Sequence, residues 1–151
     1  MAQSLHKIYI HLIFHIKNDG TPIREDDQER VHSYIGQLVN ATGCAVVRVG
    51  GTADHVHILF LLSKDASISY VVEEVKRNSS RWLKSVEYYY RVFAWQGGYA
   101  AFSVSRSMVD KTIDYISNQR EHHKKWTFAE EYIEFLKLYD VDYNEEYVLK
   151  D

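Results

Sequence analysis

The chain contains very little cysteine and no long apolar run, and each shortage excludes a class of protein. Cys44 is the only cysteine in 151 residues, which excludes an internal disulfide and any zinc site built from several cysteines. No apolar run reaches the roughly 18 residues needed to span a bilayer, and the first residues lack a signal-peptide cleavage pattern. We therefore expect a cytoplasmic protein.

The charged residues are unevenly distributed along the chain. The net charge is −3, but residues 127–151 hold 8 acidic and 2 basic residues, whereas residues 76–125 hold 10 basic and 4 acidic residues. A basic middle with an acidic tail permits a phosphate-binding face, although a basic stretch is more commonly a solvated helix face. Charge alone leaves both interpretations open.

The order of apolar patterns predicts one domain over residues 1–151. We expect strands over 5–16, 44–50, 55–62 and 99–105, and helices over 24–42, 67–85, 108–123 and 128–139. The order β-α-β-β-α-β is typical of the α+β, ferredoxin-like (RRM-like) split βαβ fold, an antiparallel sheet with helices on one face. The opposite face is then free for a ligand or for further helices, and the fold is expected to include a helix toward the C-terminus, over 108–123, that carries Tyr115.

The stretch "HVHILF" (55–60) places two imidazoles in an apolar strand. Because side chains alternate along a strand, His55 and His57 share one face, and Val56 and its apolar neighbours share the other. By the same alternation, His11 and His15 of the first strand belong to the face that carries the histidine pair. Two histidines spaced in this way can chelate a metal ion, but such a pair is more often incidental on a half-exposed sheet face, and two ligands are too few for a site.

The third predicted helix offers the missing ligand. Tyr115 and Gln119 lie four residues apart, so they stack on one side of this helix with His122 close by. An amide oxygen at Gln119 could be the third metal ligand while the Tyr115 phenol points toward the same ion. A tyrosine on a helix is more often part of the core.

These stretches together resemble a known family. The chain resembles the single-tyrosine HUH transposases in three stretches: "HVHILF", the downstream "YISNQREHH" (115–123), and "WQGGYAAFSVSRS" (95–107), which precedes the third predicted helix. HUH stands for histidine, hydrophobic residue, histidine. The similarity extends over nearly the whole chain. REP-associated tyrosine transposases are relatives of this family.

The resemblance implies a specific chemistry. It makes Tyr115 the nucleophile, and His55, His57 and Gln119 the ligands of a divalent ion, Mg²⁺ or Mn²⁺. The implied activity is cleavage and rejoining of single-stranded DNA, at hairpin-forming transposon ends, through a 5′-phosphotyrosine intermediate during transposition. The resemblance further implies a homodimer, in which the tyrosine can serve its own subunit or the partner, in a bacterial or archaeal cytoplasm.

Basic side chains suggest where DNA would bind, and other functions remain open. The candidate phosphate contacts are Lys76, Arg77, Arg81, Lys84, Arg120 and Lys124. The alternative to a transposase is a domesticated, non-cleaving protein of the same fold that binds single-stranded nucleic acid. A third alternative is a metal-binding or interaction protein in which the acidic tail matters most. Neither alternative needs Tyr115 and Gln119 beside the histidines.

Overall fold

The computed structural model of the protein describes residues 2–150, which are built around one antiparallel sheet. The strand order is β2-β3-β1-β4. The strands are β1 (Tyr9–His15), β2 (Ala45–Gly51), β3 (His55–Leu61) and β4 (Ala100–Val104). With the helices in their observed order, this is the ferredoxin-like arrangement that the sequence predicts.

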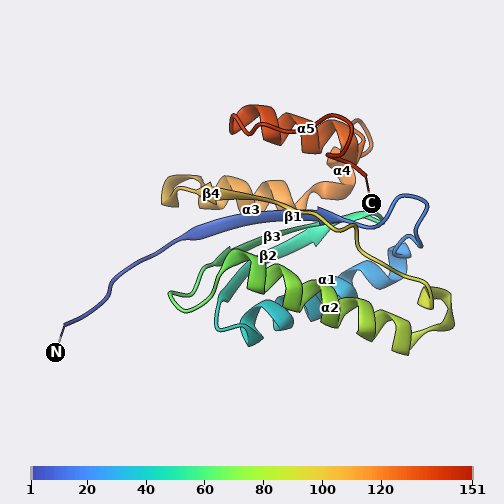
Figure 1. The fold of residues 1–151 in the computed structure, drawn as a ribbon, viewed down its shortest axis with the longest axis horizontal. Coiled ribbons are helices and arrows are strands. Elements are labelled where there is room, and N and C mark those ends of the chain that lie inside the picture. The colour runs from blue at the N-terminus through green and yellow to red at the C-terminus, as the bar shows by residue number, and fades with distance from the viewer. Residues whose placement is uncertain (1, 151) are drawn as a thin grey trace.

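Two long helices cover one face of the sheet, α1 (Glu25–Ala41) and α2 (Ile68–Val86) (Figure 1). Apolar side chains from both helices meet the alternate residues of β1 and β3 in the largest core cluster, which includes Leu12, Phe14, Val56, Ile58, Val31, Ile35, Val71 and Val75. The predicted cap of α2 is confirmed, because the Ser67 side chain accepts a hydrogen bond from the Tyr70 amide. Both predicted helices therefore form within two residues of their expected bounds.

The opposite face of the sheet is covered by further helices. These are α3 (Val109–Ser117), α4 (Gln119–His122) and α5 (Phe128–Leu138), with short 3₁₀ turns η1 (Tyr88–Tyr90) and η2 (Arg106–Met108) elsewhere in the chain. Figure 1 shows α3 and α5 on the side of the sheet away from α1 and α2. Thr127 and Glu130 form a capping box that begins α5. No helix in the described part of the chain is long and apolar enough to cross a bilayer.

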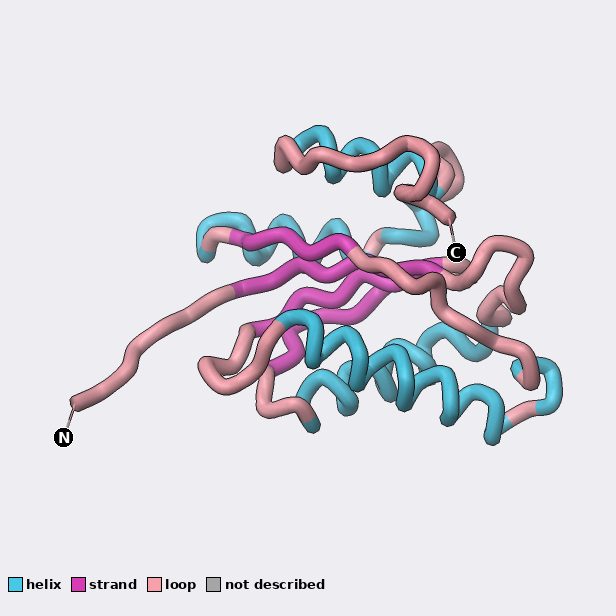
Figure 2. The backbone as a smooth tube through the Cα atoms, viewed as in Figure 1, coloured by secondary structure: helices cyan, strands magenta, loops and turns pink. Residues whose placement is uncertain are grey.

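The structure corrects two predicted boundaries. The helix expected over 108–123 is interrupted at Asn118, where the backbone (φ −106°, ψ 24°) leaves the helical region, so α3 and α4 are separate (Figure 2). The Asn118 side chain donates to the Asp114 carbonyl at 2.8 Å, a local bond that competes with helix continuation. The first strand is also shorter than residues 5–16, because its partners in β3 and β4 pair only from Tyr9 onward.

A glycine lets α3 lie directly on β2. A Cβ atom added to Gly50 would lie 2.2 Å from the carbonyl oxygen of Ile116 and 2.8 Å from its Cγ2 atom. Both distances are far below a van der Waals contact, so only glycine fits at this position. The close approach fixes the height of α3 above the sheet, and with it the position of the residues that α3 carries.

Substitution Gly50→Ala should therefore destabilise the protein. We expect a loss of about 1–3 kcal/mol in the free energy of unfolding, since the added methyl group pushes α3 away from β2. Urea unfolding followed by circular dichroism measures this loss. Gly97→Ala is the matched control, because nothing lies within 4 Å of a Cβ atom at that position. Equal stability of the two variants would contradict the close-packing argument.

Candidate metal centre and tyrosine site

The sheet brings the two histidines of "HVHILF" to the face covered by α3, α4 and α5. In the pairing of β3 with β1, His55 lies opposite His15, and His57 lies opposite Ile13. The side chains of His55 and His57 are 0% exposed, so this face is a dry interior. The predicted alternation of β3 is confirmed, but the half-exposed sheet that was the competing interpretation is not what forms.

The break between α3 and α4 places Tyr115 and Gln119 beside this pair. The Gln119 Oε1 atom lies 2.8 Å from His55 Nε2, and the Gln119 amide nitrogen donates to the Tyr115 carbonyl at 3.4 Å. The ring centres of Tyr115 and His57 are 5.7 Å apart. The structure thus brings together all four residues that the sequence analysis singled out, within one chain.

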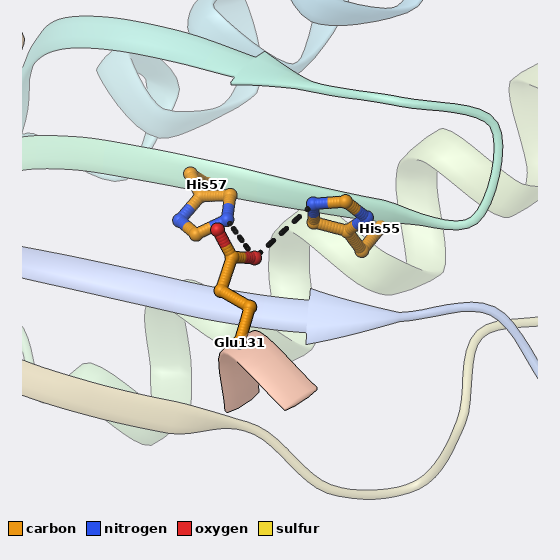
Figure 3. A group of neighbouring side chains, drawn as sticks. All are labelled: His55, His57 and Glu131. Atoms are coloured by element: carbon orange, nitrogen blue, oxygen red, sulfur yellow. Dashed lines mark hydrogen bonds and ion pairs between the residues drawn. The ribbon is translucent and has the colours of Figure 1, made fainter. Parts of the chain in front are cut away.

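A carboxylate that the sequence analysis missed lies at the centre of the site. Glu131 reaches from α5, and its Oε1 atom is 2.9 Å from His57 Nε2 and 3.5 Å from His55 Nε2 (Figure 3). Its second oxygen, Oε2, accepts the hydrogen bond of the Tyr115 hydroxyl. His55, His57 and Glu131 form a buried group that can hold a metal ion. One carboxylate therefore joins the histidine pair to the tyrosine.

A signal for Glu131 was present in the sequence. Phe128, Tyr132 and Phe135 lie at helical spacing and form the apolar side of α5 that faces the sheet. Glu131 falls between them on the same side of the helix, where a lone acid must find a partner when it is buried. A charged residue inside an apolar stripe was the available clue.

Two further histidines surround the carboxylate. His123 Nε2 lies 3.1 Å from Glu131 Oε1 and 3.0 Å from Gln119 Oε1. His122 Nε2 lies 3.2 Å from the Tyr115 hydroxyl. The sequence analysis noted His122 only as a neighbour of Tyr115 and Gln119, whereas here it contacts the tyrosine and His123 contacts the donor cluster.

The outer hydrogen bonds orient the histidine rings toward one point. His55 Nδ1 lies 2.7 Å from the Asp54 carboxylate, which requires a hydrogen at Nδ1 and leaves the lone pair of Nε2 facing Gln119. His57 Nδ1 lies 2.8 Å from His11 Nε2. If the hydrogen between these two atoms is on His57 Nδ1, the lone pair of His57 Nε2 faces Glu131. Outer partners of this kind fix metal-binding tautomers in proteins.

The donor set fits a divalent cation. Nitrogen lone pairs that face amide and carboxylate oxygens repel them unless a proton or a cation lies between, so the arrangement favours bound positive charge. Neighbouring ligands of an octahedral ion with bonds near 2.1 Å are about 3.0 Å apart. The observed separations of 2.8, 2.9 and 3.5 Å between donor atoms bracket this value.

Burial and charge set the protonation states. Burial lowers the pKa of His57 to about 4 against the opposing effect of Glu131, and burial lowers the pKa of His11 well below its usual value. Burial raises the pKa of Glu131, but the contacts with His123, His57 and Tyr115 together outweigh it and hold this pKa well below the usual range. Burial, followed by the contact with Glu131, raises the pKa of Tyr115. At neutral pH the site therefore has a neutral His57, a charged carboxylate and a protonated phenol.

The predicted DNA contacts are divided between the two sides of the sheet. Lys76 lies on α2, where its ammonium group donates to the carbonyls of Gln96 and Gly98 at 2.7 and 2.6 Å and is used within the fold. Arg77, Arg81 and Lys84 are on the same helix, across the sheet from the histidines. Arg120, on α4, and Lys124, just after it, are exposed and follow Gln119 closely in the chain; Arg120 pairs with Glu25 of α1 at 3.3 Å and Lys124 with Glu121 at 2.9 Å. Of the predicted contacts, only Arg120 and Lys124 are close in the chain to residues of the candidate site.

Two solved structures share this fold, and both are described as transposases. A candidate transposase from Deinococcus radiodurans R1 has a TM-score of 0.60 and 20% identity, covering 79% of this chain and 98% of its own. A REP-associated tyrosine transposase bound to a REP hairpin has a TM-score of 0.59 and 13% identity, covering 84% of this chain and 76% of its own. At these identities the likeness establishes the fold.

The sequence establishes the family. The family described as "Transposase IS200 like" matches residues 4–119. The protein belongs to the IS200-like transposase family, which confirms the resemblance found in the sequence. No curated protein sequence matches the chain. The family match ends at Gln119, so His122, His123 and Glu131 lie beyond it.

The buried histidines predict a loss of stability in acid. The unfolded chain binds a proton at His57 near its usual pKa of 6.5, whereas the folded chain binds one only near pH 4. This contribution is therefore complete above pH 6.5 and is lost as the pH falls to about 4, with His11 and His32 acting in the same sense and His123 opposing. We expect His57 to account for at most roughly 3 kcal/mol.

Urea unfolding of metal-free protein between pH 7.5 and 4, in steps of about half a unit, measures this loss. His57→Asn should flatten the dependence on pH, because one buried group that must stay neutral is removed. His6→Asn is the control, since His6 is exposed and its loss should leave the slope unchanged. A free energy of unfolding that stays constant from pH 6.5 to 4 would contradict the assigned burial.

Proposed function

We propose that this protein is a metal-dependent tyrosine transposase that cuts and rejoins single-stranded DNA through a 5′-phosphotyrosine intermediate. The observation that carries the proposal is the shared carboxylate of Glu131, which touches the Tyr115 hydroxyl with one oxygen and His57 with the other. In a chain of a transposase family, a tyrosine tied to a metal-binding group is placed for nucleophilic attack on a phosphate.

The proposed cleavage balances in bonds and protons. The Tyr115 oxygen attacks the phosphorus, a bond forms between them, and the bond from phosphorus to the 3′-oxygen breaks. The phenol loses its proton and the departing 3′-oxygen gains one. The phosphotyrosine keeps the energy of the ester bond, so the 3′-hydroxyl of a second strand can reverse the step and release Tyr115 without ATP.

The chain's own residues supply position and charge for this step. His55, His57, Gln119 and Glu131 would hold the divalent ion, Mg²⁺ or Mn²⁺, with His11 and Asp54 orienting the histidines. The ion, when bound, would act as a Lewis acid on the phosphate and on the leaving oxygen. Glu131 Oε2 accepts the phenol hydrogen bond, so this oxygen lies beside the proton that Tyr115 must lose.

The DNA approaches from the Tyr115 side of the site. The histidines are buried, whereas Tyr115 is half-buried and lines a cavity of about 180 Å³ with His122, Trp126 and Leu138. This cavity is smaller than the roughly 300–1,000 Å³ of typical ligand pockets. A DNA strand that enters it therefore has to move α3 and α5 apart. Lys124, exposed just after α4, is the favoured phosphate contact, because the Arg120 guanidinium faces Glu25 and Gln28 of α1.

Hairpin-forming single-stranded DNA is the proposed substrate, by analogy with the REP hairpin in the similar structure. The homodimer and the cytoplasmic location stay predictions from the family resemblance. The described residues of one chain already bring Tyr115 to the histidines, so a partner is not needed to complete the site. The enclosure of the site by α5 is the feature that favours the alternative, a non-cleaving protein that binds nucleic acid.

A covalent adduct distinguishes the transposase from this alternative. Native protein incubated with single-stranded hairpin DNA and Mn²⁺ should form a band on a denaturing gel that contains both DNA and protein. Tyr115→Phe should abolish the band, since the attacking oxygen is gone. Tyr70→Phe, at an exposed position on α2, is the control and should leave it unchanged. An adduct that survives Tyr115→Phe would assign the chemistry to another residue.

Removal of the metal should stop the same reaction. We expect adduct formation to fall by at least about 100-fold after dialysis against EDTA, because the phosphate then loses its Lewis acid. Adding Mg²⁺ or Mn²⁺ back should restore it. The rate of adduct formation, measured from gel time courses before and after dialysis, is the readout. An unchanged rate in EDTA would remove the metal from the proposed mechanism.

A further inference from the structure

The segment that follows the family match places one more imidazole in the donor cluster. His123 Nε2 lies 3.0 Å from Gln119 Oε1 and 3.1 Å from Glu131 Oε1, and its ring centre is 4.5 Å from that of His55. These separations match those between the other donor atoms. His123 therefore lies beside two donor atoms of the site, Gln119 Oε1 and Glu131 Oε1, next to the group formed by His55, His57 and Glu131.

The ring of His123 is oriented as a ligand would be. Its Nδ1 atom lies 2.8 Å from the Trp126 carbonyl, which accepts hydrogen bonds only, so a hydrogen is present at Nδ1. In the neutral ring this leaves a lone pair at Nε2, directed at the cluster. His55 and His57 are oriented in the same way by Asp54 and His11. His55 and His123 thus have outer acceptors that fix the metal-binding tautomer, and His57 has His11 as an outer partner that is compatible with it.

We propose that His123 and Glu131 complete a nitrogen-rich ligand set with His55, His57 and Gln119, and that this set selects a first-row transition ion such as Mn²⁺ over Mg²⁺. The inference rests on the proposed function, which assigns a divalent ion to this site. It goes beyond that function by adding a ligand and by ordering the two candidate metals.

The chemistry of the donors gives the direction of selectivity. Imidazole nitrogen suits transition ions, whereas Mg²⁺ prefers oxygen ligands, keeps several of its waters and dehydrates reluctantly. Three imidazoles in a buried site leave little room for bound water. The single carboxylate of Glu131 provides the negative charge that both ions need, so the nitrogen donors decide between them.

Metal binding to purified, metal-free protein tests the proposal without DNA. Isothermal titration calorimetry of the native chain should show Mn²⁺ bound at least about 10-fold more tightly than Mg²⁺. His123→Ala should weaken Mn²⁺ binding by about 10- to 100-fold, as expected for the loss of a group that contacts the ion directly or through another ligand. Its effect on Mg²⁺ should be smaller, because Mg²⁺ depends less on nitrogen.

The adjacent histidine is a matched control. His122 Nε2 faces the Tyr115 hydroxyl at 3.2 Å and only the outer oxygen of Glu131, at 3.5 Å, so His122→Ala should change Mn²⁺ affinity by less than about 3-fold. Glu131→Gln should weaken Mn²⁺ binding, whereas Glu134→Gln, an exposed acid on the same helix, should not. Tighter Mn²⁺ binding by Glu131→Gln would mean that the carboxylate blocks the site, and would overturn the proposal.

Cobalt substitution separates a ligand from a neighbouring hydrogen-bond donor. Imidazole N–H protons of histidines bound to paramagnetic Co²⁺ are strongly shifted in proton NMR spectra. The proposal expects three such exchangeable signals in the native protein and two in His123→Ala. If alanine prevents folding, as judged by circular dichroism, His123→Asn replaces it. Three signals in the folded variant, or equal affinities for Mn²⁺ and Mg²⁺ in the native chain, would overturn the ligand assignment.

The two proposals fail in different ways. Native protein that binds Mn²⁺ through three histidines but forms no DNA adduct would overturn the proposed function and leave the ligand set standing. Native protein that forms the adduct but loses no Mn²⁺ affinity in His123→Ala would overturn the ligand set and leave the function standing.

Discussion

The buried carboxylate of Glu131 is the interaction on which the rest of the site depends. A charged group that is 1% exposed is costly unless it is paired and hydrogen-bonded, and here every partner belongs to the candidate site. One oxygen faces His57 and His123, and the other accepts the hydrogen bond of Tyr115. The same contacts that compensate for burial therefore connect α5 to the sheet and Tyr115 to the histidine pair. Aromatic residues around the carboxylate, including Phe128 stacked on His55 at 4.4 Å between ring centres, keep water away.

The chain consists of a part that matches the family, residues 4–119, and a following segment that covers the face of the sheet with the histidines. The family match ends at Gln119, and within it lie the sheet, the histidine pair, the tyrosine and the amide. The residues that follow add His123 and Glu131 and place α5 over the face that carries the histidines. In a water-poor interior, electrostatic interactions are stronger than at a surface. In the proposed function, enclosure would therefore strengthen the binding of a cation and would restrict the approach of DNA to the side on which Tyr115 is half-buried.

The sequence predicted the parts of the site that follow from local periodicity. Alternation along β3 placed His55 and His57 on one face, and helical spacing placed Gln119 one turn after Tyr115. The roles of Tyr115 and Gln119 came from the family resemblance, and remain predictions. Periodicity failed at Asn118, where a side-chain bond to Asp114 ends the helix. Lys76 stays a predicted phosphate contact, and in the fold its ammonium group donates to two carbonyls of the loop before β4.

By itself, the sequence determined the ferredoxin-like order of elements, the face of the sheet that carries the histidines, and the family. These depend on periods of 2 and 3.6 residues and on motifs of adjacent residues, which can be read along the chain. The tertiary structure alone decided that α5 covers this face and that Glu131 and His123 join the histidines. Glu131 is 74 residues from His57 in the chain, and the packing of the apolar side of α5 on the sheet sets their contact. No local pattern encodes that distance.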